Sequence, residues 1–182
     1  MINFFLVFFL IFSFSFGQNQ NLKTLSWKED RPLAWKDFRG KPKVNTNAAA
    51  LTASGVSFGF SIGKTGNKIT DFNTNVECVF YPTESWYKDE DANPHILRHE
   101  QIHFDITELF TRKFRQQISD LRASPKIKNQ LNSLYEAISK ASSKMQNLYD
   151  EETNHSINKV QQKKWDDYIV AELRTLEAFK TK

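Results

Sequence analysis

The chain has a single cysteine, Cys78, among its 182 residues, so it cannot form an internal disulfide bond. Its stability must therefore come from a hydrophobic core, together with any metal ion that the folded chain binds. Cys78 lies in a run of alternating apolar residues. We expect a buried, small apolar side chain there and no catalytic thiol, because no nucleophile motif surrounds it.

A block of Lys and Arg is also missing, although 25 basic residues against 21 acidic ones give a net charge of +4. Basic and acidic residues alternate along the sequence, as they do on a solvated surface. This pattern excludes the dense basic footprint of many nucleic-acid-binding proteins, and we expect no nucleic-acid partner. Internal repeats and low-complexity linkers are absent as well.

Residues 1–17 contain no charged residue and are almost wholly apolar. The run is short for a membrane span, polar residues follow it, and Ser15 and Gly17 are small enough for a cleavage site. We predict a signal peptide over residues 1–17 and an exported protein, periplasmic or extracellular, with no stable membrane span after its removal. Because no Lys or Arg precedes the run, an uncleaved anchor stays open, whereas the lack of a following cysteine excludes a lipoprotein anchor.

Removal of the signal peptide leaves about 165 residues, which suits one domain over 18–182. Residues 18–50 form an extended aromatic segment without a clean period. Residues 51–81 alternate apolar and polar side chains around a turn, which predicts a β-hairpin. Apolar residues then recur with a helical period over 94–122 and 125–182, the second stretch as two helices. The expected fold class is α+β, with a small antiparallel sheet followed by three helices.

The most informative motif is His99-Glu100-Gln101-Ile102-His103, which reads H-E-x-x-H. Asn93 and Pro94 suit the start of a helix that would carry it. Imidazoles four residues apart lie one above the other on a helix, so both can reach one tetrahedral ion, and Glu100 then faces the water at its open position. The motif predicts one Zn²⁺ ion held by His99 and His103.

A catalytic zinc ion needs a third protein ligand. His155 is the first candidate, because a helical return can bring the break between the last two helices beside the motif. Asp150 is the alternative third ligand and Glu152 follows it. His95 precedes His99 by one turn, but three successive i,i+4 positions cannot converge on one tetrahedral ion, so we expect it to be exposed.

Other polar residues receive secondary roles at this stage. Asp105 or Asp150 can orient a ligating imidazole through its second nitrogen. Tyr149 and His155 are candidate donors to the oxyanion that develops during hydrolysis. Glu108 lies on another side of the same helix, and we expect it to be solvated.

The chain resembles the bacterial domain-of-unknown-function 922 family, usually grouped with the zincin-like metallopeptidases. The matching residues are Trp35-Lys36-Asp37-Phe38-Arg39-Gly40, Ser85-Trp86, the run from Leu97 to Glu108, Tyr149-Asp150, Thr153 and His155. The family pattern ends in His-Gly, whereas Ser156 follows His155 here. The resemblance implies a zincin-like fold with H-E-x-x-H on its first long helix, and a secreted or periplasmic zinc peptidase without a known substrate.

The sequence thus predicts a zinc metallopeptidase that acts on a peptide or protein substrate, with Glu100 as general base. By analogy with zincin-like folds, the strand ending at Tyr81 is the candidate edge for an extended peptide. Two other classes stay open. One is a non-catalytic, metal-holding envelope domain that uses Trp27, Trp35 and Trp86 as contacts; the other is a structural protein in which the histidines are accidental.

Overall fold

The computed structural model describes residues 24–43 and 46–181. The predicted signal peptide lies outside these residues. Within them, no helix combines the length and the apolar character needed to cross a membrane.

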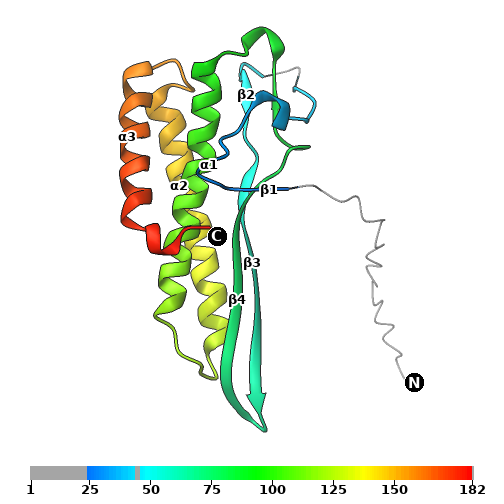
Figure 1. Ribbon diagram of the computed structural model, residues 1–182, viewed down its shortest axis with the longest axis vertical. Helices are drawn as coiled ribbons and strands as arrows, with labels where there is room; N and C mark the ends of the chain where they lie inside the picture. Colours follow the sequence, from blue (N-terminus) through cyan, green and yellow to red (C-terminus); the bar gives the residue numbers. More distant parts are fainter. Residues whose placement is uncertain (1–23, 44–45, 182) are drawn as a thin grey trace, which may run out of the picture.

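A long β-hairpin dominates the strand layer (Figure 1). Strand β3 (Ser54–Thr65) pairs antiparallel with β4 (Lys68–Phe80), with Val56 opposite Cys78. The short strand β1 (Leu25–Ser26) pairs with the end of β4, which gives the order β1-β4-β3. Strands β2 (Ala50–Leu51) and β5 (Trp86–Tyr87) form a second, two-stranded sheet.

Three helices lie side by side on one side of the hairpin, with α3 farthest from it (Figure 1). They are α1 (Pro94–Ser119), α2 (Ile127–Thr153) and α3 (Lys159–Thr175). Helix α1 packs against both strands of the hairpin and against both other helices. Short 3₁₀ turns complete the described chain at Trp35–Asp37, Asp89–Asp91 and Glu177–Phe179.

The core forms where the apolar face of the hairpin meets the apolar stripe of α1. Cys78 and Phe80 are fully buried on β4, as Ile106 and Phe114 are on α1. Phe58 of β3 contacts the rings of both Phe114 and Tyr135, which joins the hairpin to two helices. The α+β fold class with a small antiparallel sheet and three helices is confirmed, and α1 is held in the centre of the molecule.

Two expectations about burial are wrong. Glu108 is fully buried instead of solvated, because it accepts hydrogen bonds from Arg112 and from the Thr181 backbone and hydroxyl. Trp27 and Trp86 are also buried, so neither offers an aromatic surface to a partner. The indole of Trp27 donates to Asp105 at 2.8 Å, which ties the N-terminal segment to α1.

Near Tyr81, strand β4 does not have a free edge. Val79 and Phe80 pair with β1 on one side and with β3 on the other. The edge strands beside α1 are instead β2 and β3, since each stands at the end of its sheet. The prediction was wrong because the sequence does not show which strand takes the central place.

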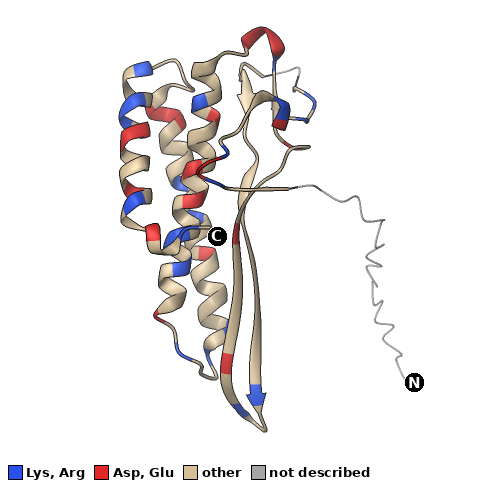
Figure 2. Ribbon diagram, in the orientation of Figure 1, with Lys and Arg blue, Asp and Glu red and all other residues tan. Residues whose placement is uncertain are grey.

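Basic and acidic residues are interspersed along the three helices (Figure 2). This agrees with the alternating charges of the sequence, and it gives the described surface the mixed character typical of a solvated protein.

Candidate metal centre

Helix α1 begins immediately before the candidate metal ligands. The side chain of Asn93 accepts a hydrogen bond from the Ile96 amide, and Pro94 occupies the first helical turn, so the free amides of the helix end are partly satisfied. His99 and His103 follow on one face, with ring centroids 4.8 Å apart. The local sequence is sufficient to place this pair.

Asp150 joins the two histidines from α2. Its Oδ1 atom lies 3.2 Å from His99 Nε2 and 3.0 Å from His103 Nε2, and the two Nε2 atoms are 3.2 Å apart. The three side chains form a group that can hold a metal ion. They come together because α2 returns antiparallel along α1 and carries Asp150 back beside the motif.

The size of this triangle fits a tetrahedral zinc site. Zinc binds imidazole nitrogen and carboxylate oxygen at about 2.0–2.1 Å, so neighbouring ligand atoms in a tetrahedron lie about 3.3 Å apart. The observed edges of 3.0–3.2 Å are close to this value. Two imidazoles and one carboxylate are also a ligand set found in zinc hydrolases, with a fourth position left for water.

The three side chains of the triangle change one another's pKa values. Burial alone would raise the pKa of Asp150, but the hydrogen bonds to His103 and His99 outweigh it and hold this pKa well below its usual range. Burial lowers the pKa of His99. Burial would also lower the pKa of His103, yet the bond to Asp150 and the charge of Glu100 raise it overall. The carboxylate is thus ionised and attracts a cation between the rings.

The site is closed on one side and open on the other. Tyr149 stacks on the ring of His99, with centroids 4.6 Å apart, and its hydroxyl donates to the His99 carbonyl at 3.4 Å. Tyr149 is fully buried, so a substrate has no access to its hydroxyl. The Asp150 side chain is 32% exposed, compared with 5% for His99. The triangle is therefore accessible to solvent from the Asp150 side.

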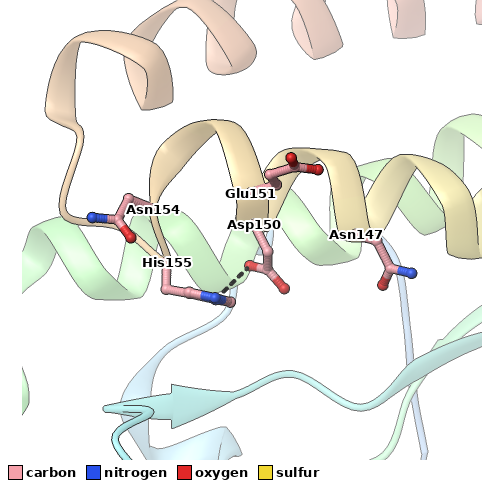
Figure 3. Close-up of a pocket in the computed structure, with 5 residues that line it drawn as sticks. All are labelled: Asn147, Asp150, Glu151, Asn154 and His155. Atoms are coloured by element: carbon pink, nitrogen blue, oxygen red, sulfur yellow. Dashed lines mark ion pairs between the residues drawn. The ribbon is translucent and has the colours of Figure 1, made fainter.

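His155, the first candidate for the third ligand, lies outside the triangle. Its side chain is 74% exposed, and its Nδ1 atom is 3.7 Å from Asp150 Oδ1. Figure 3 shows both side chains at a pocket of about 450 Å³, together with Asn147, Glu151 and Asn154. The geometry thus favours Asp150, the alternative, as third ligand and leaves His155 at the edge of the opening.

The remaining candidates have other partners. Glu152 accepts a hydrogen bond from the Trp165 indole at 2.8 Å. Asp105 accepts from Trp27 and Gln101, and neither bond reaches a histidine of the triangle. His95 is half-buried instead of exposed, because its Nε2 atom lies 2.6 Å from the Ser156 carbonyl.

Glu100 lies on α1 between the two histidines and is 4% exposed. Its Oε2 atom is buried and has no hydrogen-bond partner in the part of the chain that the structure describes. A buried carboxylate oxygen without a partner is costly. A ligand or a water molecule in the adjacent site would provide the missing hydrogen-bond partner.

Gln146 is a site residue that the sequence did not reveal. Its carbonyl oxygen lies 2.6 Å from His103 Nδ1, on the side of the ring opposite the triangle. The signal that points to it is its spacing: it precedes Asp150 by four residues, which places both on one face of α2. That signal has meaning only once Asp150 is recognised as part of the site.

A family model described as "Bacterial protein of unknown function (DUF922)" matches residues 34–156, more than half of the chain. The chain belongs to the DUF922 family. The matched range contains the triangle, Glu100 and the pocket residues. No curated protein matches the chain, and no solved structure does.

Gly40 and Ser85, which both lie within the matched range, have structural roles. The amide of Gly40 donates to the Ser85 carbonyl at 2.7 Å, and a β-carbon at Gly40 would lie 2.8 Å from that oxygen. The Ser85 hydroxyl in turn accepts from the Ala53 amide and donates to the Tyr81 carbonyl. These contacts fix the segment between β2 and β3 beside α1.

The turn after α2 has a backbone conformation that favours glycine. Asn154, His155 and Ser156 have positive φ angles of 48°, 50° and 74°. Only glycine adopts this region without steric cost. Ser156 therefore adds strain to the turn that carries His155.

Proposed function

We propose that this protein is a zinc-dependent metallopeptidase of the zincin-like group, exported to the periplasm or the exterior. The observation that carries the proposal is the triangle of His99, His103 and Asp150, whose dimensions suit a tetrahedral ion, beside the buried carboxylate of Glu100. Ligand type favours zinc over magnesium or calcium, which prefer oxygen ligands alone.

In the proposed hydrolysis, the ion and the protein side chains have different roles. A zinc ion held by His99, His103 and Asp150 would bring the pKa of its water toward neutrality and polarise the scissile carbonyl group. Glu100 accepts a proton from the attacking water at its carboxylate and delivers it to the leaving amine. The absence of a competing hydrogen bond at Glu100 Oε2 within the described residues leaves this oxygen ready to take that proton.

The contacts of the segment from Ala50 to Ser54 support a role in aligning a peptide. The Thr52 hydroxyl donates to the Glu100 carbonyl at 3.2 Å, and the Ser54 hydroxyl lies 2.7 Å from that of Thr107. Strands β2 and β3 are both edge strands, and an extended peptide can pair with such an edge through its main chain. In this proposal β2 and β3 replace the strand ending at Tyr81 as the binding edge.

His155 is the available donor for the oxyanion. It lines the opening beside Asp150, whereas the hydroxyl of Tyr149 is buried against the His99 backbone. A donor near the developing negative charge lowers the barrier of acyl transfer.

Replacement of Glu100 by Gln tests the proposal. We expect one zinc ion per chain in both the wild type and the variant, while the variant loses peptide cleavage by a factor of about 10²–10⁴. Metal analysis and mass spectrometry of a digested peptide library provide the two measurements. Exposed Glu136 on α2 offers a matched control, since Glu136→Gln should change neither. A wild type that binds zinc without cleaving any library peptide would argue for a metal-holding binding domain.

A further inference from the structure

The side-chain amide of Gln146 forms three hydrogen bonds, which fix its orientation. Its nitrogen donates to the His103 carbonyl at 2.9 Å and to the Thr107 hydroxyl at 3.2 Å. Its oxygen lies 2.6 Å from His103 Nδ1. Because a carbonyl oxygen can only accept, the hydrogen in this last bond must belong to His103 Nδ1.

This bond decides which nitrogen of His103 carries a lone pair. With the proton on Nδ1, the neutral ring presents an unprotonated Nε2 atom. That atom is the one that points into the triangle, 3.2 Å from His99 Nε2 and 3.0 Å from Asp150 Oδ1. Without the acceptor at Gln146, the neutral ring is more stable with its proton on Nε2, because Asp150 then accepts a hydrogen bond from that atom.

We propose that Gln146 is a positioning residue for the metal centre, which holds His103 in the tautomer that binds a cation through Nε2. The inference builds on the proposed metal site and adds to it a residue on α2 that does not contact the ion. Outer groups of this kind commonly change metal affinity by about 10–100-fold.

The Gln146 network also reaches the strand layer. Thr107, which accepts from the Gln146 amide, lies 2.7 Å from the Ser54 hydroxyl of β3. The same bonds that orient His103 therefore connect it to the edge where the peptide is proposed to bind. This connection requires an amide at position 146, because a carboxylate would accept a hydrogen bond from His103 but could not donate one to Thr107.

The test compares Gln146→Met with the wild type. Nitrogen-15 NMR of the metal-free protein, at a pH above the titration of its histidines, reports the tautomer of His103. We expect the Nδ1-protonated form in the wild type and the Nε2-protonated form in the variant. Zinc titration should then show a loss of affinity of about 10–100-fold in the variant.

Gln130→Met on the same helix is the matched control, since Gln130 is exposed and its side chain accepts a hydrogen bond from Ser124, away from the metal centre. Gln146→Glu is the partial rescue variant: it keeps an acceptor for His103 but loses both bonds that the amide nitrogen donates, so its zinc affinity should lie between those of Gln146→Met and the wild type. The inference fails if wild-type His103 carries its proton on Nε2. It also fails if Gln146→Met binds zinc as tightly as the control, or if Gln146→Glu is as weak as Gln146→Met.

These outcomes separate the inference from the proposed function. A wild type that binds no zinc would refute the metallopeptidase, while NMR of the same sample would still decide the tautomer. Should Gln146→Met fail to fold, the wild-type tautomer and the zinc affinity of Gln146→Glu remain as measurements that decide the inference.

Discussion

Asp150 and His103 are 47 residues apart in the sequence, yet Asp150 Oδ1 lies 3.0 Å from His103 Nε2. The contact joins α2 to the motif helix α1, and it completes a group of three potential ligand atoms, of which the motif alone supplies two. The third member of this group therefore depends on how the two helices pack.

Asp150→Ala and His155→Ala should separate the two candidate ligands. Loss of Asp150 removes one corner of the triangle, so we expect zinc affinity to fall by at least about 100-fold. Loss of the exposed His155 should lower affinity by less than about tenfold. Calorimetric titration of both variants gives the comparison, and the reverse order would restore His155 as the ligand.

Ser156→Gly should stabilise the protein by about 1 kcal/mol, because glycine adopts the φ of 74° at this position without the clash of a β-carbon. Urea unfolding of both proteins measures the difference. The control is Ser143→Gly in the middle of α2, where added backbone freedom should cost about 0.5–1 kcal/mol. Equal destabilisation at both sites would show that the turn carries no strain.

Arg112→Met should destabilise the fold by about 3–5 kcal/mol, because it leaves the carboxylate of Glu108 buried without its ion-pair partner. Arg112 is 1% exposed and also donates to the Leu173 carbonyl at 2.6 Å. Thermal or denaturant unfolding provides the measurement. Arg122→Met, at an exposed position after α1, should stay within about 0.5 kcal/mol of the wild type.

Cys78 should resist thiol reagents in the folded protein. Burial, reinforced by the charge of Glu108, raises the pKa of its thiol well above the usual range, so little thiolate forms. Labelling at pH 8 should be at least about a thousandfold slower in the native than in the unfolded chain. Rapid labelling of the native protein would contradict this burial.

The same raised pKa has a consequence for stability. The folded state holds the thiol proton more tightly than the unfolded chain, which releases it above about pH 8.5. The contribution of the protonated Cys78 thiol to the free energy of unfolding is thus complete below that pH, and it declines as the pH rises further. A Cys78→Ala variant should lose this part of the alkaline decline in urea unfolding, whatever its stability at neutral pH.

The sequence by itself determined what depends on local geometry. The spacing of His99 and His103, and the helix start at Asn93, place two imidazoles on one face because a helix repeats every few residues. Alternation of apolar residues likewise determined the face of β4 that carries Cys78. The α+β class followed from strands that precede helices.

Only the tertiary structure decided what depends on contacts between distant segments. Asp150 and Gln146 reach His103 because α2 packs antiparallel to α1. No local sequence pattern predicts how the two helices are aligned along each other. Glu108 is buried because the C-terminal residues fold back over it, and the end of β4 has no free edge because β1, from the N-terminal part of the chain, pairs with Val79 and Phe80. A linear pattern gives periodicity within an element, whereas the partners of a side chain are set by how whole elements pack.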